Sequence, residues 1–309
     1  MLSKDLAIVL VNFNGFQDTY ECVKSIREHS ENTPYIVIVD NSEPNEMALH
    51  NLEDDNLHII FNKKNQGFGK ANNIGINWVQ KNIDFKSLLL LNNDTIVNSS
   101  SLSTMLKCLN EEEVDIVSCK IVYHDEPSII WYGGGEINYK KGWPKVVDFN
   151  QHETSEGATK SRFVTFVSGC VILFSKNALK HLKGFDEDLF MYVEDLELSV
   201  RAHQKGLKIW YTSEAVIRHK VQGSFVGDNH YKGMHPKNKN VAYHFYHKKK
   251  NQWITFRKHL HGKDYRTFRR YYWANFFKTL IRLIILSPKR FKVIGSAFMV
   301  IRSLSLRSE

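Results

Sequence analysis

Four apolar runs, separated by segments with helical spacing, dominate the first hundred residues. A continuous apolar run indicates a strand that is covered on both faces, whereas apolar residues three or four positions apart indicate an amphipathic helix. Alternating strands and helices with short loops predict a parallel, doubly wound sheet. The predicted strands lie at residues 6–11, 35–40, 57–62 and 87–92, and the predicted helices at residues 18–29 and 70–82.

The middle of the chain is less regular. Residues 120–165 are rich in Gly, Trp, Tyr and charged residues, which is typical of loops and irregular strands. From Asn240 onward the chain is predicted to be helical, with many basic and aromatic residues. Between these segments the pattern predicts strands at residues 162–175 and 207–219, and helices at residues 176–181 and 195–206.

Composition is consistent with a globular protein. The chain has 309 residues, 42% of them hydrophobic and 24% charged, enough for one large α/β domain with an appendage. The N-terminus lacks the pattern of a signal peptide, so none is expected. Four cysteines without CxxC spacing suit reduced, structural thiols in a cytosolic protein.

Charge is divided unequally along the chain. Residues 1–200 contain 18 Lys and Arg against 29 Asp and Glu, a net charge of −11. Residues 201–309 contain 24 against 4, a net charge of +20, and the two parts sum to the +9 of the whole chain. A basic C-terminal third predicts contact with an anionic surface, either phospholipid or nucleic acid.

Polar residues follow three of the predicted strands. They are Asn12 and Asn14 after the first, Asp40-Asn41-Ser42 after the second, and Asn92-Asn93-Asp94-Thr95 after the fourth. Each group alone is also what an ordinary turn or helix cap would contain. Since the carboxyl ends of parallel strands meet at one edge of a sheet, where clefts form, the three groups together predict a binding site.

A glycine-rich loop at residues 65–76 follows the third predicted strand. Gly67 and Gly69 have the spacing of a dinucleotide fingerprint, but position 72 is Asn and the loop does not follow the first strand. The GxxxxGK[ST] phosphate loop is absent from the sequence as well. If a nucleotide binds here, a divalent cation is therefore the natural way to neutralise its diphosphate.

A second acidic cluster occupies residues 184–206. Carboxylates at a helix start are commonly solvated residues that the helix dipole favours. Glu194 and Asp195, however, follow the apolar segment Leu189–Val193, so at least one carboxylate is expected near a pocket wall. There it could accept a proton from an incoming hydroxyl group.

Several of these motifs occur in one order that resembles the family 2 glycosyltransferases, particularly the bacterial rhamnosyltransferase-like members that build surface polysaccharides. They are VLVNFNG, VDNS, NQGFGKANNIGI, LLLLNNDT, FVSGCVILFSKNAL, KGFDEDLFMYVEDLELSVRAHQKG and RHKVQGS, and they span about residues 5–225. The resemblance implies a GT-A fold, a mixed α/β sheet flanked by helices. The implied catalytic domain covers residues 1–239, with a nucleotide-sugar half to about residue 120 and an acceptor half from about residue 121.

The resemblance also implies roles for individual residues. Val11 and Asn12 would lie along the nucleotide base, Asp40 would hydrogen-bond the pyrimidine, and Asn92 would face the ribose, with Asn93 beside it. The glycine-rich loop would border the base, ribose or diphosphate through Asn65, Gly67 and Lys70.

The reacting groups are implied in the same way. Asp94 would bind Mg²⁺ or Mn²⁺, and His219 would complete the metal and diphosphate site. Asp195, beside Glu194, would be the general base of an inverting transfer. Two departures from the family pattern are Asn92 at the first position of the metal motif and the spacing H-K-V-Q-G-S after His219.

The implied activity is transfer of a sugar, rhamnose or another hexose, from a UDP- or dTDP-sugar to a glycan or lipid-linked acceptor. The alternative is a protein of the same fold that binds a nucleotide or glycan without catalysis. Residues 240–309 resemble interfacial membrane segments, which predicts a cytoplasmic protein peripheral to the inner face of the cell membrane. Laid on a helix, however, residues 265–286 lack a clean polar face, so packing on the catalytic domain or forming a homodimer is the alternative. No motif supports binding of nucleic acid.

Overall fold

The computed structural model describes residues 2–30, 32–221 and 233–305. The first elements are β1 (Leu2–Asn12), α1 (Phe16–His29), β2 (Tyr35–Asp40), the 3₁₀ helix η1 (Met47–Leu52), β3 (Leu57–Phe61), α2 (Phe68–Asn82), β4 (Ile83–Asn92), β5 (Thr95–Val97) and α3 (Ser101–Glu111). They are followed by β6 (Ile116–Tyr123), β7 (Ile130–Tyr132), β8 (Gly135–Asn138), β9 (Trp143–Val146), β10 (Arg162–Val164), β11 (Val171–Ser175), α4 (Lys176–Leu182), α5 (Glu194–Gln204) and β12 (Ile209–His219). The last helices are α6 (Val241–His259), α7 (Gly262–Leu286) and α8 (Arg290–Ser305).

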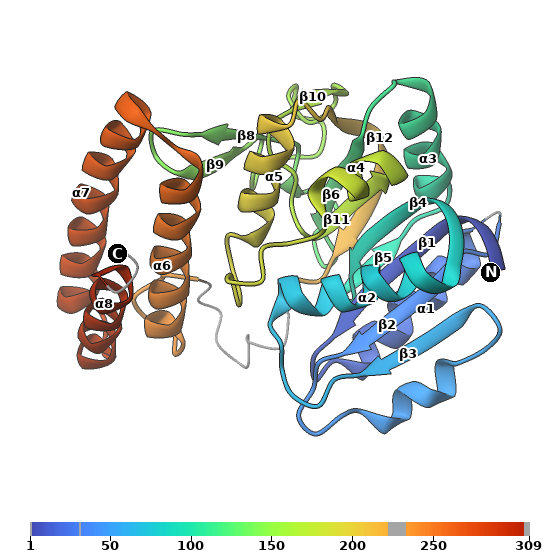
Figure 1. The fold of residues 1–309 in the computed structure, drawn as a ribbon, viewed down its shortest axis with the longest axis horizontal. Helices are drawn as coiled ribbons and strands as arrows, with labels where there is room; N and C mark the ends of the chain where they lie inside the picture. Colours follow the sequence, from blue (N-terminus) through green and yellow to red (C-terminus); the bar gives the residue numbers. More distant parts are fainter. Residues whose placement is uncertain (1, 31, 222–232, 306–309) are drawn as a thin grey trace.

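The four predicted N-terminal strands form the parallel part of the main sheet, in the order β4-β1-β2-β3. The register pairs Asn12 with Asp40 across β1 and β2, and Val11 with Asn92 across β1 and β4. The three polar strand ends therefore share one edge of the sheet, as predicted. Helix α2 packs on β1, β2 and β4 and separates this part of the sheet from solvent (Figure 1).

Beyond β4 the sheet becomes mixed, which confirms the fold class that the family resemblance implies. The order continues β11, β6, β12 and β10, with β5 beside β12 and β7 beside β6. Strand β11 runs antiparallel to β4 and β6, whereas β12 runs parallel to β6. The purely parallel arrangement predicted from the first hundred residues thus holds only for that segment.

The single strand predicted at residues 162–175 is wrong, because the structure divides it into β10 and β11. A turn intervenes, in which the N–H of Val171 donates to the carbonyl of Ser168 over 3.3 Å. The N–H of Gly169 turns away from the sheet and donates to Asp195 Oδ2 over 3.2 Å. A local apolar pattern cannot reveal this break, since its cause is a contact with a residue 26 positions away.

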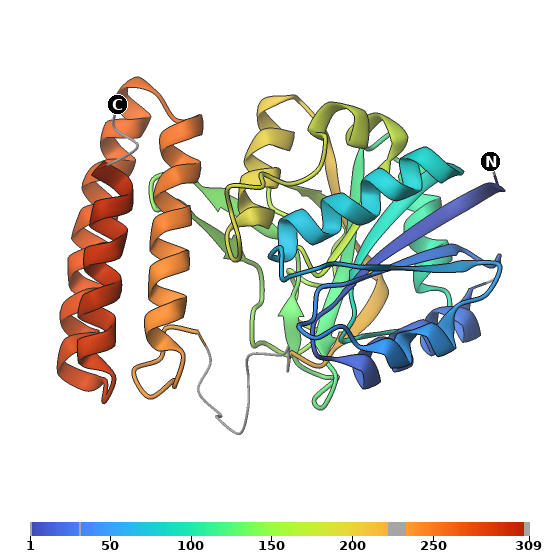
Figure 2. The ribbon, with the colours of Figure 1, turned by 60° about the horizontal axis from the view of Figure 1, so that its bottom comes forward.

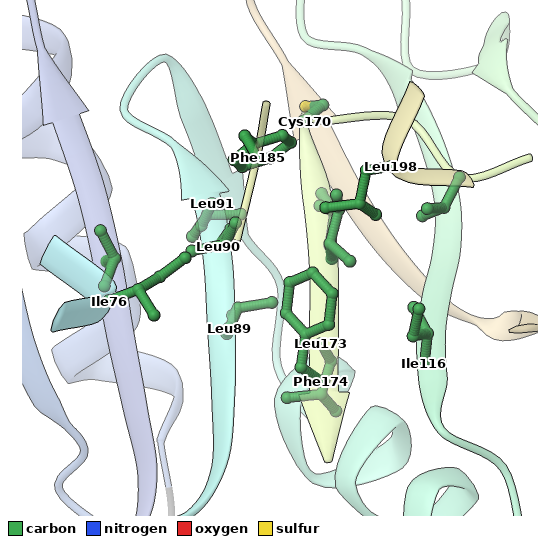
Figure 3. Close-up of a cluster of buried hydrophobic side chains, with 14 of the residues drawn as sticks. Ile76, Leu89, Leu90, Leu91, Ile116, Cys170, Leu173, Phe174, Phe185 and Leu198 are labelled. Atoms are coloured by element: carbon green, nitrogen blue, oxygen red, sulfur yellow. The ribbon is translucent and has the colours of Figure 1, made fainter. Parts of the chain in front are cut away.

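The core lies between β4, β11 and the helices that cover them. Figure 3 shows leucines of β4 beside Leu173 and Phe174 of β11, with Phe185 and Leu198 packed over them. Each of these side chains is at least 96% buried, and burial of one large apolar side chain contributes about 1.5–3 kcal/mol. The core therefore fixes the carboxyl end of β4, from which the polar residues Asn92 to Asp94 emerge.

The three C-terminal helices form a separate layer beside the sheet (Figure 1). Helix α6 faces the domain that contains the main sheet through two amide side chains. Asn251 Nδ2 donates to the carbonyls of Met191 and Tyr192, both over 2.9 Å, and Gln252 Nε2 donates to the carbonyl of Lys141 over 2.9 Å. Helix α6 of this region therefore packs on the domain that contains the main sheet. No helix in the described ranges is long and apolar enough to cross a membrane.

A buried ion-pair network also joins α6 to α5. Glu197 of α5 is fully buried, and its carboxylate accepts hydrogen bonds from Arg201 Nε over 2.8 and 2.9 Å. His259 Nε2 of α6 lies 2.9 Å from Glu197 Oε1. Burial raises the pKa of Glu197, but the hydrogen bonds and charges of His259 and Arg201 outweigh it, so this pKa lies below its usual value.

Replacing Glu197 by Gln is expected to lower the free energy of unfolding by about 3–5 kcal/mol, because it leaves the largely buried guanidinium of Arg201, whose side chain is 17% exposed, without its charge partner. A denaturant titration measures this change.

The same carboxylate makes stability depend on pH. Because the folded-state pKa of Glu197 is depressed, the stabilisation it contributes is present above its unfolded-state pKa and is lost as pH falls through its folded-state pKa. Glu111→Gln, which breaks only the exposed pair of Lys107 and Glu111 at 3.9 Å, is the control and should cost less than about 1 kcal/mol. Equal stability of the Glu197 and Glu111 variants would contradict the prediction.

Candidate active site

At the carboxyl edge of the parallel strands, Asn12 is the centre of a buried polar cluster. Its Nδ2 donates to Asp40 Oδ1 over 2.9 Å and to Glu46 Oε2 over 2.6 Å, while its Oδ1 accepts from Thr19 Oγ1 over 2.7 Å. Asp40 is fully buried, and its Oδ2 accepts from the N–H of Glu46 over 2.8 Å. The structure thus brings the predicted residues Asn12 and Asp40 together, although here they bond to each other. Their contact with a nucleotide stays a prediction.

Residues of the NNDT segment join this cluster from β4. Asn93 Nδ2 donates to Thr19 Oγ1 over 2.9 Å and lies 3.5 Å from Asn12 Oδ1. The N–H of Asn92 donates to the carbonyl of Cys170 over 2.9 Å, which ties the end of β4 to the turn before β11. Asn93 therefore links the strand end to α1, while Asn92 lies partly exposed at the same edge.

The glycine-rich loop is held close to the second acidic cluster. Gly67 has φ +79°, and a Cβ there would lie 2.1 Å from the carbonyl oxygen of Phe190, so this position requires glycine. Asn65 Oδ1 accepts from the N–H of Gly67 over 2.8 Å and shapes the loop. Lys70, expected near the base, ribose or diphosphate, makes an ion pair with Glu187 at 3.3 Å.

The two predicted metal ligands meet, although they lie 125 positions apart in the chain. His219 Nε2 lies 3.1 Å from Asp94 Oδ1, and both side chains are buried. The pairing of β12 with β5 sets His219 opposite Thr95, and the N–H of Lys220 donates to the carbonyl of Asp94 over 2.9 Å. Burial raises the pKa of Asp94, but the charge and hydrogen bond of His219 outweigh it, so this pKa lies below its usual value. The rest of the motif, residues 222–224, lies outside the described residues.

The chemistry of this pair fits a divalent cation. A carboxylate oxygen and an imidazole nitrogen are both metal donors, and Nδ1 of His219 is buried without a hydrogen-bond partner among the described residues. Within those residues, no group of three His, Cys, Asp or Glu side chains could hold a metal ion. A cation bound at Asp94 and His219 would thus need further ligands from a substrate diphosphate or from water.

Glu194 and Asp195 stand at the start of α5 and differ in their partners. Asp195 is partly exposed, and its carboxylate accepts from the N–H of Gly169 over 3.2 Å and from the N–H of Leu196 over 2.8 Å. Glu194 is buried, and its Oε2 has no hydrogen-bond partner within the described part of the chain. Burial raises the pKa of both carboxyl groups, that of Glu194 to about 8 with the charge of Asp195 adding to it. Asp195 thus has two N–H donors that favour its ionised form, whereas Glu194 Oε2 has none among the described residues.

Both carboxyl groups line a cavity of about 510 Å³ that has seven aromatic residues in its wall. Trp131 in its wall also contacts the His219 ring, with ring centroids 4.6 Å apart, so one side chain joins the cavity to the pair of predicted metal ligands. Lys248 of α6 reaches the same cavity, where its Nζ lies 5.0 Å from the Tyr192 ring centroid. A hollow of about 660 Å³ at the opposite edge of the sheet contains none of the predicted site residues.

Three residues of this site were not predicted from the sequence. In the sequence, Glu46 lies between two predicted strands, where a loop is expected, and Trp131 lies in the irregular segment 120–165. Lys248 belongs to a run of three lysines that is typical of a solvated surface. No local signal identifies them, because each reaches the site through tertiary packing. Only the richness of the segment 120–165 in Trp and Tyr could have suggested an aromatic wall.

Comparisons with known proteins identify the family of this chain. Residues 5–254 match the family described as Glycosyltransferase like family 2. The low-salt glycan biosynthesis hexosyltransferase Agl10 of Haloferax volcanii is 23% identical over 211 residues, which cover 66% of this chain and 64% of the relative. The O-antigen chain rhamnosyltransferase RfbN of Salmonella typhimurium is 20% identical over 224 residues, with coverages of 69% and 66%. The match thus spans slightly less than two thirds of each relative.

Solved structures show the same fold. GalNAc-T7 with UDP, GalNAc and Mn²⁺ gives a TM-score of 0.56 at 18% identity, covering 69% of this chain and 43% of its own. The mannosyltransferase PcManGT from Pyrobaculum calidifontis, with GDP-Man and Mn²⁺, gives 0.53 at 12% identity, covering 99% and 76%. These likenesses confirm the GT-A fold. Since the family match covers most of the chain, the protein belongs to glycosyltransferase like family 2.

Proposed function

We propose that the protein is an inverting glycosyltransferase that moves a sugar, rhamnose or another hexose, from a UDP- or dTDP-sugar to a glycan or lipid-linked acceptor. The observation that carries this proposal is an aromatic cavity that has the acidic pair in its wall and is joined through Trp131 to the proposed metal ligands. Family membership and the two relatives named for glycan synthesis support a role in building a surface polysaccharide. We also propose that the protein works as a peripheral protein at the cytoplasmic face of the membrane.

On the donor side, the polar strand ends bind the nucleotide. In the proposal Val11, Asn12 and Asp40 border the base, and the loop from Asn65 to Lys70 borders the ribose and diphosphate. Asp94 and His219 would hold Mg²⁺ or Mn²⁺, which when bound supplies Lewis-acid stabilisation of the leaving diphosphate. The Mn²⁺ in both solved structures compared above supports use of a divalent ion.

On the acceptor side, Asp195 is the general base. The acceptor oxygen attacks the anomeric carbon, its proton passes to the Asp195 carboxylate, and the bond from the anomeric carbon to the diphosphate breaks. Asp195 is suited to this role because it is partly exposed and keeps two N–H donors that favour its ionised form. The transfer forms no covalent intermediate with the protein, so the anomeric configuration inverts.

Lys248 is one of the groups that lower the pKa of the proposed base, and its contribution can be tested. Burial raises the pKa of Asp195, while the hydrogen bonds from the N–H groups of Gly169 and Leu196 and, to a smaller extent, the positive charge of Lys248 oppose that rise. In Lys248→Met the pKa of Asp195 should therefore rise further, so that the acidic limb of the kcat/KM profile moves to higher pH. Lys250→Met is the matched control, since Lys250 lies over Tyr246 rather than in the cavity. An acidic limb that stays in place in Lys248→Met would contradict the assignment.

A donor screen tests the proposed function itself. Nucleotide release should be measured from UDP-, dTDP- and GDP-sugars with a panel of glycan and lipid-linked acceptors. Release that depends on one donor and one acceptor class is expected. Calorimetry that detects nucleotide binding while every acceptor stays inert would instead favour the binding protein without catalysis.

A further inference from the structure

Helices α7 and α8 carry many exposed apolar side chains, including three at the turn between them. Of the thirteen large hydrophobic side chains that are exposed in the described part of the chain, eight lie between Phe277 and Ile301. Ile285 is 71% exposed and Phe291 76% exposed, on either side of the turn. A soluble surface seldom gathers so many exposed apolar side chains without a partner for them.

The spacing of these residues shows that they form outward faces. Phe277, Ile281 and Ile285 follow one another at four-residue intervals, so they lie along one side of α7. Phe276 and Leu283 point inward, and both are fully buried. On α8, Phe291 and Phe298 are two turns apart on an exposed side, while Val293 and Val300 are buried. Helices α7 and α8 thus have one apolar side that packs within the helical bundle and a second apolar side that is exposed to solvent in the described part of the chain.

The charge of this region indicates which kind of surface these exposed apolar side chains bind. Residues 265–305 contain nine Lys and Arg and no Asp or Glu. Lys289, Arg290 and Lys292 surround the turn, and all three are exposed. Apolar side chains ringed only by basic ones complement the headgroups and acyl boundary of an anionic bilayer. The same charge opposes pairing of this face with a second copy of itself.

We propose that the α7–α8 tip, meaning Ile285, Leu286 and Phe291 with Lys289, Arg290 and Lys292, inserts into the interface of an anionic phospholipid bilayer. The tip would enter the interface without any helix crossing the bilayer, since no described helix is long and apolar enough to span one. Figure 2 shows the tip and the start of α6 at the same end of the helical layer. Because α6 also carries Lys248 into the cavity, docking of the tip sets the catalytic part close to the bilayer.

This inference deepens the proposed function, since a bilayer is where a lipid-linked acceptor would be met. The test is cosedimentation of the full chain with phosphatidylcholine vesicles, with and without phosphatidylglycerol, in the absence of donor and acceptor. Vesicle binding is therefore measured independently of catalysis, so a failure of the proposed enzymatic activity would not change its outcome. Wild type should bind only the anionic vesicles, and binding should weaken as salt is raised.

The double variant Ile285→Glu/Phe291→Glu should bind the anionic vesicles at least tenfold more weakly. Met47→Glu, an exposed apolar residue on η1, is the matched control and should bind like wild type. Unchanged thermal unfolding shows that the variant is folded, as expected for two exposed side chains. Equal vesicle binding by the double variant and wild type would overturn the proposal. So would a wild-type dimer that the double variant loses without any vesicle binding, which would assign the face to a second copy.

Discussion

Replacing Asp195 by Asn is expected to lower kcat by about 10²–10⁴-fold, the range that a positioned general base contributes. Asn has the size of Asp, and its carbonyl oxygen can still accept the N–H of Gly169 or Leu196. What it loses is the capacity to take the proton of the acceptor hydroxyl. Nucleotide affinity, measured by calorimetry, should stay close to that of wild type. The residues proposed to bind the nucleotide lie on β1, β2 and β4 and in the glycine-rich loop, whereas Asp195 lies on α5.

Glu194→Gln is the matched control for this variant. Burial and the charge of Asp195 raise the pKa of Glu194 to about 8, so it carries a proton at neutral pH and is no base for the acceptor. Its replacement by a neutral amide should therefore reduce kcat far less than Asp195→Asn. If Glu194→Gln is the more damaged of the two variants, the base has been assigned to the wrong carboxyl group.

Replacing Asp94 by Asn is expected to lower kcat/KM on the order of 10²–10³-fold, the cost of removing one electrostatic contact to the developing charge. The variant should also need more Mn²⁺ for half-maximal rate, since it removes the anionic donor of the proposed metal site. A Mn²⁺ titration of nucleotide release measures both effects. Circular dichroism checks that the buried partner His219 has not been released by unfolding.

The same substitution at Asp84 provides the control. Asp84 pairs with Lys176 at 2.9 Å on the surface, within β4 but away from its carboxyl end. Asp84→Asn should keep wild-type turnover and Mn²⁺ dependence. An Asp94→Asn enzyme that matches Asp84→Asn in both respects would show that Asp94 holds no catalytic cation.

The sequence alone predicted the parallel strands well because their signals are local. The strand at residues 35–40 has the same bounds in the structure, and the shared edge of Asn12, Asp40 and Asn92 follows from strand order alone. The contact of Asp94 with His219, by contrast, could not be predicted from local signals. It was implied by the family resemblance, since nothing in the residues near either one specifies the pairing of β5 with β12.

The run Lys248-Lys249-Lys250 shows why the rest of the site could not be predicted. Successive residues of a helix point about 100° apart, so these three lysines meet three environments. Lys248 lines the cavity, Lys249 Nζ donates to Asn275 Oδ1 over 2.6 Å, and Lys250 lies over Tyr246. The rotation of α6 decides which lysine enters the cavity, and Asn251 and Gln252 fix that rotation by bonding to carbonyls of the catalytic part.

The C-terminal helices show a related limit. Residues 265–286 lack a clean polar face because α7 has two apolar sides, one packed in the bundle and one exposed. A helix projection merges the two sides and so obscures the amphipathic pattern. Only the packing of Phe276 and Leu283 against neighbouring helices reveals that Phe277, Ile281 and Ile285 form a separate face.

The most direct test of the proposed function is sugar-nucleotide turnover by wild type and Asp195→Asn, before and after EDTA. Wild type should release nucleoside diphosphate only when acceptor and divalent cation are both present. EDTA should abolish this release, added Mn²⁺ should restore it, and Asp195→Asn should stay nearly inactive throughout. Turnover that persists in EDTA, or an Asp195→Asn enzyme as fast as wild type, would contradict metal-assisted transfer with Asp195 as the base.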